Sequence, residues 1–269
     1  MQEMTVGIAG FGTIGYVVAK ALDKGIPGLR LVAVSARDMA RAETRMEDFN
    51  SPAAVVSLAD LANRADVVVE CLPAAAFLDI AEPAIETGRI FVPLSCGMLL
   101  QYPHLAQRAR ETGARLIVPT GALLGLDAVH AAAKGTIHSV RMVTRKPPGG
   151  LAGAPYLQEK GISVENLHKP LKVFAGSARD GAAGFPANVN VAAALSLAGI
   201  GADRTELEIW ADPGQSRNKH TITVDADSAR FEMTIENIPT DENPRTGKIT
   251  ALSVIATLEG LVSPLKVGT

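Results

Sequence analysis

Two patterns of apolar and polar residues divide the chain. In its first part, short continuous apolar runs alternate with segments whose apolar residues recur at helical spacing. Six runs predict strands, at residues 4–9, 29–34, 53–56, 65–71, 89–94 and 114–119. Strands that are apolar on both faces belong inside a parallel sheet with helices on each side. This part therefore predicts an α/β domain with a doubly wound parallel sheet.

The pattern changes after about His138. Segments 206–209, 221–224 and 231–236 alternate polar and apolar residues. Such alternation gives a strand one wet and one packed face, which is typical of an antiparallel sheet. We expect a helix over 186–197 to cover the packed face and a Pro-Gly loop at 146–150. The second part thus predicts an α+β domain with a mainly antiparallel sheet.

Composition and charge narrow the class of protein. Hydrophobic residues make up 47% of the chain and charged residues 20%, which suits a globular core and excludes disorder as the main state. A net charge of −2 and an aromatic fraction of 4% argue against nucleic-acid binding. Residues 1–10 lack the features of a signal peptide, and the small-apolar run 191–202 is too short to span a bilayer. With Cys71 and Cys96 in apolar runs and no Cys-x-x-Cys metal pattern, we expect a cytoplasmic protein that binds neither metal nor membrane.

The segment GFGTIG at residues 10–15 matches the pattern G-x-G-x-x-G between the first predicted strand and a predicted helix. Its first glycine permits a tight turn, the second lets the backbone approach a pyrophosphate, and the third lets the helix pack on the strand. The free N–H groups at the helix N-terminus also favour phosphates. A glycine-rich turn with only a packing role is the alternative. We expect NAD or NADP to contact Gly10, Phe11, Gly12, Thr13 and Ile14.

The residues after the second strand leave the choice between NAD and NADP open. An acidic residue about twenty positions after the last glycine usually holds the ribose hydroxyls of NAD. That place is occupied by Ser35, and Asp38 comes slightly late. Arg37 could instead contact a 2′-phosphate, and a solvated surface arginine is equally compatible with the pattern.

Loops after the fourth and fifth strands place further residues where open α/β sheets bind ligands, beyond the carboxyl ends of the strands. They bring Cys71, Leu72 and Cys96 into consideration as residues flanking a nicotinamide. The pattern favours a packing role over a nucleophilic one for each cysteine.

One of the five histidines, His220, is the candidate for acid/base catalysis. It begins the strand 221–224 and by parity faces the same side as Ile222 and Val224. Partial desolvation there lowers the pKa of an imidazole and keeps it a neutral base near neutral pH. From the pattern alone, a structural histidine beside the core is favoured.

Two amides, Asn188 and Asn190, interrupt the apolar stretch 185–191. Buried amides need hydrogen-bond partners. A cofactor carboxamide or ribose is one candidate partner. Neighbouring backbone is the other, and the pattern favours it.

Several motifs, in order over nearly the whole chain, resemble the L-aspartate dehydrogenase family. They are the segment 10–15, Pro119-Thr120-Gly121-Ala122, Thr144-Arg145-Lys146-Pro147, the segment 185–190, Ala211-Asp212-Pro213 with Asn218-Lys219-His220, and Asn243-Pro244-Arg245-Thr246. The resemblance implies NAD(P)-dependent oxidative deamination of L-aspartate to iminoaspartate, then oxaloacetate and ammonia, and a place in pyridine nucleotide biosynthesis. It also implies that His220 is catalytic and that Ala122 and Asn190 contact the cofactor.

The resemblance sets the expected organisation. By analogy with two-domain dehydrogenases, the terminal helix 248–262 returns to the first domain, with Ile249, Leu252, Ile255 and Leu258 on one stripe. We expect a dinucleotide-binding domain at residues 1–122 plus 246–269. Residues 123–245 would form the substrate, catalytic and oligomerisation domain, in a homodimer or higher homo-oligomer.

In the expected mechanism, His220 is the general acid/base and cationic or hydroxyl side chains hold the two substrate carboxylates. The sequence does not rank the donors available in the motif loops, which are Arg145, Lys146, Lys219, Arg245 and Thr246. Two other functions stay open. One is a dihydrodipicolinate-reductase-like NAD(P) reductase of another C=N or C=C substrate, and the other is a non-catalytic dinucleotide-sensing module. A paralogue with another amino-acid substrate is also compatible.

Overall fold

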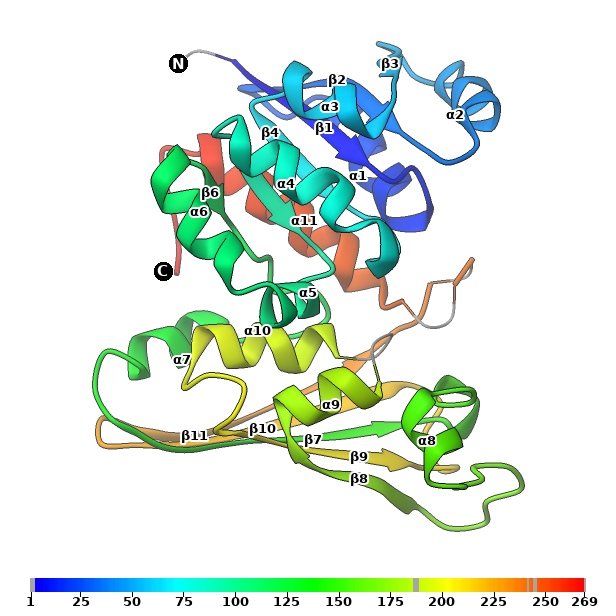
Figure 1. Cartoon of the computed structure of the whole chain (residues 1–269), viewed down its shortest axis with the longest axis vertical. Coiled ribbons are helices and arrows are strands. Elements are labelled where there is room, and N and C mark those ends of the chain that lie inside the picture. Colours follow the sequence, from blue (N-terminus) through cyan, green and yellow to red (C-terminus); the bar gives the residue numbers. More distant parts are fainter. Residues whose placement is uncertain (1–2, 186–188, 241, 244–245, 269) are drawn as a thin grey trace. The chain divides into compact units, whose positions relative to one another are not determined.

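The computed structural model describes residues 3–185, 189–240, 242–243 and 246–268. The chain divides into two compact units (Figure 1). Unit 1 comprises Met1–Pro119 and Ala251–Lys266, and unit 2 comprises Thr120–Thr250 and Val267–Thr269.

Unit 1 is built around a six-stranded parallel sheet. Its strands are β1 (Met4–Ala9), β2 (Leu29–Ser35), β3 (Ala54–Val55), β4 (Val67–Glu70), β5 (Ile90–Pro93) and β6 (Arg115–Leu116). They lie in the order β3-β2-β1-β4-β5-β6, with every neighbouring pair parallel. Strand order reverses between β1 and β4, which is where doubly wound sheets bind their ligands. The predicted Rossmann-type α/β domain is therefore confirmed.

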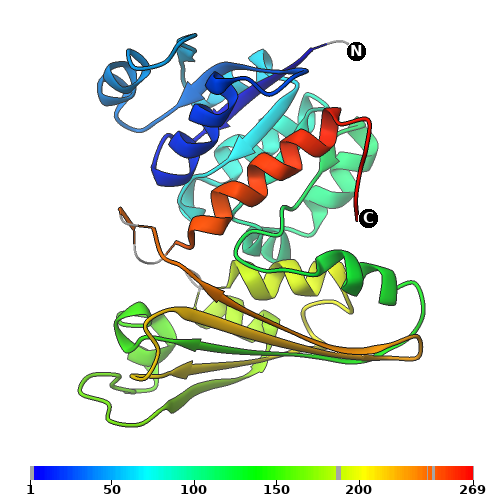
Figure 2. The same cartoon turned by 180° about the vertical axis from the view of Figure 1, so that it is seen from behind.

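Helices cover both faces of this sheet (Figures 1 and 2). On one face lie α1 (Thr13–Lys24) and α11 (Lys248–Val262); on the other lie α3 (Leu58–Arg64), α4 (Leu78–Glu86) and α6 (His104–Thr112). Val6 and Ile8 of β1 share a core cluster with α1 and α11, whereas Gly7 faces Leu61 of α3. The described residues of this unit also form α2 (Met39–Met46), η1 (Ala74–Ala76) and α5 (Gly97–Gln101).

The terminal helix α11 has the predicted bounds and packs in the core of unit 1, and the predicted stripe was partly right: Leu258 is buried and Ile255 packs against the core cluster. The side that it buries carries Ala251, Val254 and Leu258. Ile249 and Leu252 of the predicted stripe are 39% and 58% exposed. Because the helix is apolar on most of its circumference, spacing alone does not select the buried side.

Unit 2 contains a mixed five-stranded sheet. Its strands are β7 (Ile137–Lys146), β8 (Leu171–Ser177), β9 (Thr205–Ala211), β10 (Asn218–Ala226) and β11 (Arg230–Asn237), in the order β11-β10-β7-β9-β8. The β7–β9 pair is parallel and the other three pairs are antiparallel, which confirms a mainly antiparallel sheet. Strand β8 was not predicted, because a register shift between Lys172 and Phe174 buries the adjacent Val173 and Phe174 and breaks the alternation.

Helices α7 (Leu126–Ala132), α9 (Ala178–Gly184) and α10 (Asn190–Ala198) lie on one face of this sheet (Figure 1). The helix predicted over 186–197 corresponds to α10 in the described residues, while residues 186–188 lie outside the described part. Helix α9 precedes this range and was not predicted. The remaining short helices are η2 (Pro148–Gly150) and α8 (Pro155–Glu159). The other sheet face carries surface ion pairs such as Arg141–Glu208, at 2.8 Å.

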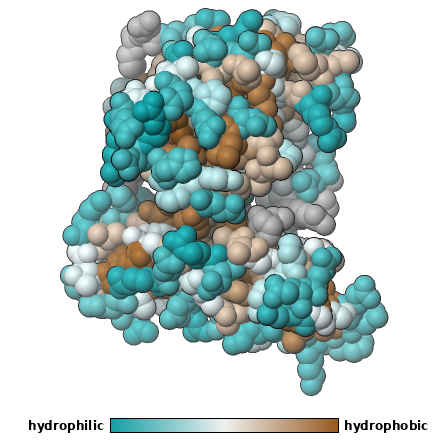
Figure 3. Space-filling view, viewed as in Figure 1, coloured by the Kyte–Doolittle hydropathy of each residue, from teal (hydrophilic) through white to brown (hydrophobic). Residues whose placement is uncertain are grey.

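Hydrophilic residues cover much of the surface seen in Figure 3. Large exposed apolar side chains, such as Val17 on α1 and Leu197 on α10, are few among the described residues. Within the same residues, no helix has the length and apolar character needed to cross a membrane.

Candidate active site

The glycine turn of unit 1 has the shape of a phosphate cradle. Gly10 has φ +100°, and a Cβ added there would lie 2.5 Å from the carbonyl oxygen of Cys71. A Cβ on Gly15 would collide with the carbonyl oxygen of Gly10. Gly12, which precedes the first turn of α1, has open space where its Cβ would be. Two glycines thus permit close packing, and the third leaves the helix N-terminus open to an anion. The turn therefore fits a dinucleotide.

The other residues of the turn differ in exposure. Phe11 is buried, and its ring packs against Tyr16 with centroids 5.5 Å apart, so its backbone faces a ligand more readily than its side chain. Thr13 and Ile14, which begin α1, are half-buried. Arg45 of α2, which no sequence motif singled out, donates from its Nη1 to the Phe11 carbonyl oxygen at 3.1 Å. Its position places a cation beside the turn.

Glu70, at the end of β4, is a second residue that the sequence analysis missed. Its carboxylate accepts hydrogen bonds from the backbone N–H groups of Leu72 and Ser95, at 2.7 and 2.9 Å, and from Ser95 Oγ at 3.0 Å. Burial raises the pKa of Glu70, and these hydrogen bonds act in the opposite direction. Glu70 therefore joins the loop after β4 to the loop after β5. Its only signal in the sequence is a carboxylate that ends a run of valines.

The two cysteines fit a packing role. Burial, followed by the charge of Glu70, raises the pKa of the Cys71 thiol well above its usual value. Because the thiolate is the nucleophile, such a thiol is poorly reactive. Cys96 is buried. Cys71 and the half-buried Leu72 nevertheless lie at the carboxyl end of β4, next to Gly10.

The residues after β2 are compatible with either dinucleotide. Ser35 is buried, and its carbonyl oxygen accepts from Gly10 N at 2.8 Å. Asp38 caps α2, where its Oδ1 accepts from Arg41 N at 3.0 Å. Arg37 is exposed beyond the carboxyl end of β2. The acidic side chain is thus engaged at a helix terminus, while the basic one faces solvent.

In unit 2, His220 is buried on β10 with 2% of its surface exposed. It lies opposite Thr144 of β7, and Thr144 Oγ1 is 3.0 Å from His220 Nδ1. Burial, followed by the charge of Lys146, lowers the pKa of His220 to about 3, so the imidazole is neutral. The other four histidines are exposed: His104, His130, His138 and His168.

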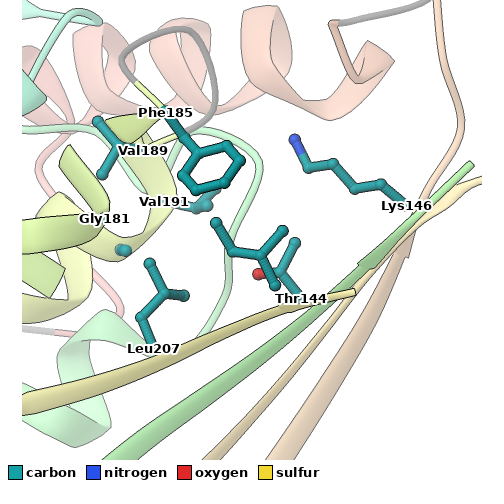
Figure 4. A pocket seen from close by; sticks show the side chains of 9 residues that line it. Thr144, Lys146, Gly181, Phe185, Val189, Val191 and Leu207 are labelled. Atoms are coloured by element: carbon teal, nitrogen blue, oxygen red, sulfur yellow. The ribbon is translucent and has the colours of Figure 1, made fainter. Parts of the chain in front are cut away.

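Lys146 was expected in a Pro-Gly loop, but it ends strand β7 and its side chain is buried, with 6% exposed. Alternation places Lys146 and Thr144 on the same face of the sheet. Both line a pocket in unit 2, together with Phe185, Val189 and Leu207 (Figure 4). Burial lowers the pKa of Lys146 to about 8. The expected loop therefore begins one residue later than predicted.

Ala122 is held close to the His220 strand by a residue that the sequence analysis missed. Its carbonyl oxygen accepts from Asn237 Nδ2 at 2.9 Å. Asn237 is 4% exposed, and its Oδ1 has no hydrogen-bond partner among the described residues. Asn237 pairs with Asn218, two residues before His220. Ala122 and His220 therefore belong to one part of unit 2.

Of the two amides in the stretch 185–191, only Asn190 lies within the described residues. Asn190 begins α10 and is exposed, so the expectation of a buried amide was wrong for it. Its neighbours Val189 and Val191 line the pocket that contains Lys146. Asn188 lies outside the described residues, as do Pro244 and Arg245 of the last motif.

A parallel sheet with a glycine cradle at its switch point, followed by a second domain with a buried neutral histidine, defines a two-domain dinucleotide-dependent dehydrogenase. Two family models match the chain accordingly. The NAD-binding domain family of homoserine dehydrogenase matches residues 10–119, and the C-terminal domain family of aspartate dehydrogenase matches residues 127–261. The chain belongs to the L-aspartate dehydrogenase family.

Individual relatives agree along the full length. The chain is 54% identical over 268 residues to L-aspartate dehydrogenase of Bradyrhizobium diazoefficiens, covering 100% of this chain and 95% of the relative. It is 38% identical over 272 residues to the Methanosarcina barkeri enzyme, covering 99% and 100%. Among solved structures, aspartate dehydrogenase from Thermotoga maritima matches with a TM-score of 0.76 and 23% identity, covering 99% of this chain and all of the other, which supports the fold.

Proposed function

We propose that this chain catalyses the oxidative deamination of L-aspartate with NAD or NADP. The overall reaction converts L-aspartate, water and the oxidised dinucleotide into oxaloacetate, ammonium, the reduced dinucleotide and a proton. The observation that carries this function is the 54% identity to an L-aspartate dehydrogenase along the whole chain. The glycine cradle and the buried His220 supply the two kinds of site that the reaction requires.

Unit 1 would bind the dinucleotide. The backbone from Gly10 to Ile14 would hold the pyrophosphate. Arg37, Cys71 and Leu72 follow the carboxyl ends of β2 and β4, and these ends lie at the same end of the sheet because all its strands are parallel. When bound, the nicotinamide supplies the acceptor for the hydrogen on the substrate Cα. The family resemblance assigns further cofactor contacts to Ala122 and Asn190.

His220 would exchange the proton. Thr144 Oγ1 lies 3.0 Å from His220 Nδ1, and in the tautomer whose Nδ1–H donates to this hydroxyl the imidazole presents Nε2 as the base. In hydrolysis, Nε2 takes a proton from the water that attacks the imine carbon, and it returns a proton in the reverse amination. Thr144 holds the ring in one orientation during both steps.

A turnover assay with L-aspartate and either dinucleotide, followed by nicotinamide absorbance, tests this function. We expect His220→Ala to lower kcat by about 10²–10⁴-fold while dinucleotide affinity barely changes. His138→Ala, which removes an exposed imidazole from β7 of the same sheet, is the matched control and should keep wild-type turnover. Near-wild-type kcat for His220→Ala at saturating aspartate would remove His220 from this role.

The same assay separates the alternative functions. A reductase of another C=N or C=C substrate would oxidise reduced dinucleotide with that substrate and ignore amino acids. A sensing module would bind dinucleotide without turnover. The homodimer and the cytoplasmic location stay predictions, and light scattering of the purified chain tests the first.

A further inference from the structure

We propose that Lys146 binds a carboxylate of the amino-acid substrate beside His220 and is therefore a specificity-determining residue, an assignment that rests on the function proposed above. L-Aspartate brings two carboxylates into the site, so at least one cation close to His220 is required for charge compensation. The motif loops contain four candidate cations, Arg145, Lys146, Lys219 and Arg245; the structure describes the first three, and Arg245 lies outside the described residues.

Two of these cations, Arg145 and Lys219, lie on the sheet face opposite His220. Arg145 Nη1 lies 3.1 Å from Asp212 Oδ2, and its guanidinium stacks 4.6 Å from the Trp210 ring centroid. Lys219 Nζ lies 3.0 Å from Glu236 Oε1. Alternation along β7 and β10 turns both side chains away from the face that carries His220. Neither cation is therefore placed to hold a substrate that contacts the imidazole.

Lys146 is on the correct face. It lies two residues after Thr144 on β7, and Thr144 is directly opposite His220, so Lys146 and His220 are diagonal neighbours, about 7–8 Å apart. A substrate carboxylate on the ammonium would leave the reacting carbon of a four-carbon amino acid within reach of the imidazole.

The pocket around Lys146 favours an anion. Its side chains come from two layers: Thr144, Lys146 and Leu207 from the sheet, and Phe185 and Val189 from the helical layer (Figure 4). Among the described residues that line it, Lys146 supplies the charge and Thr144 a hydroxyl. A carboxylate that binds an ammonium in such apolar surroundings gains more than at the surface, because water screens the pair less.

Binding at this position would also adjust the catalytic imidazole. The charged group that acts on His220 is Lys146 of β7, whereas its β11 neighbour Ile235 is uncharged. A carboxylate on Lys146 would offset the positive charge and raise the proton affinity of His220. The substrate would thereby bring the imidazole closer to a pKa suited to proton transfer.

Steady-state kinetics of Lys146→Met and Lys146→Arg test the assignment. Methionine keeps the length and packing of the stem, so we expect a folded protein whose KM for L-aspartate is raised about 10- to 100-fold, with a smaller change in kcat. Arginine should restore part of the affinity. Lys172→Met is the control, because it removes an exposed lysine from β8 of the same sheet and should leave KM unchanged.

Two further measurements make the test specific. Comparison of L-aspartate with L-asparagine shows which carboxylate is bound: loss of discrimination in Lys146→Met indicates the β-carboxylate, and equal losses on both indicate the α-carboxylate. By NMR, succinate should raise the His220 pKa in wild-type protein and leave it unchanged in Lys146→Met.

The outcomes separate the two levels of inference. A wild-type chain that does not turn over L-aspartate overturns the proposed function, and the Lys146 assignment falls with it. A wild-type chain that is active, while Lys146→Met keeps the wild-type KM and the succinate response, overturns only the assignment. A rise in KM that Arg does not relieve, with an unchanged succinate response, indicates a structural role and also overturns it.

Discussion

The buried state of His220 predicts a specific loss of stability in mild acid. The imidazole has a folded pKa of about 3 against 6.5 when it is free in the unfolded chain. Since the folded pKa is lower, the unfolded chain binds more protons below pH 6.5. His220 therefore contributes stability that is present above about pH 6.5 and is lost as the pH falls towards the folded pKa.

The size of this loss follows from the two pKa values. Between about pH 7.5 and about pH 5, one unfolded histidine takes up a proton that the folded one excludes, which lowers the free energy of unfolding by about 2 kcal/mol. Lys146, with a folded pKa of about 8, is mostly protonated throughout this interval and adds only a few tenths of a kcal/mol. The loss depends little on the exact folded pKa, because any value well below 5 gives nearly the same result.

The assay compares wild type with His220→Leu, which fills similar space and does not titrate. Chemical denaturation at both pH values, followed by tryptophan fluorescence, reports on unit 2, because the single tryptophan is Trp210 of β9. We expect wild type to lose about 2 kcal/mol more than His220→Leu between the two pH values. Equal losses would mean that His220 is solvated in the folded chain, and the burial argument would be refuted.

Two further predictions concern the cofactor contacts. Gly10→Ala should destabilise unit 1 by about 2–4 kcal/mol in thermal unfolding, since its φ is positive and its Cβ would lie 2.5 Å from Cys71 O. The Cβ of Gly12→Ala meets open space, so this variant should keep the wild-type thermal stability and lose dinucleotide affinity in a fluorescence titration. Equal destabilisation by Gly10→Ala and Gly12→Ala would contradict the cradle geometry. Asn237→Ala should weaken dinucleotide binding about fivefold by releasing the Ala122 carbonyl oxygen, while the exposed Asn63→Ala should not; unchanged binding in both would remove Asn237 from this role.

Features governed by local pattern could be predicted from the sequence. The six apolar runs gave the parallel sheet, and GFGTIG gave the turn, because a positive φ at Gly10 and close packing at Gly15 depend on residues within a few positions. The alternation of side chains along β10 is also a local pattern, and it predicted that His220 faces the buried side of the sheet with Ile222 and Val224.

Features that depend on distant contacts could not be predicted. Glu70 is significant because its acceptors are satisfied by Ser95 of the next strand-loop connection. Lys146 was expected in a loop, and only its pairing with Ala211 of β9 shows that it continues the face of β7 that carries Thr144 opposite His220. Asn237 gains its role from Ala122, which is 115 residues away. Single-sequence patterns carry no record of such partners.

The transfer of the Cα hydrogen of L-aspartate to the dinucleotide tests the central claim most directly. L-[2-²H]Aspartate is incubated with the enzyme and NAD or NADP, and the reduced dinucleotide is isolated and analysed by mass spectrometry and NMR. The account predicts one deuterium at nicotinamide C4 for each oxaloacetate formed, with both products greatly reduced in His220→Ala. Reduced dinucleotide without deuterium, or no reduced dinucleotide from the wild-type chain, would contradict it.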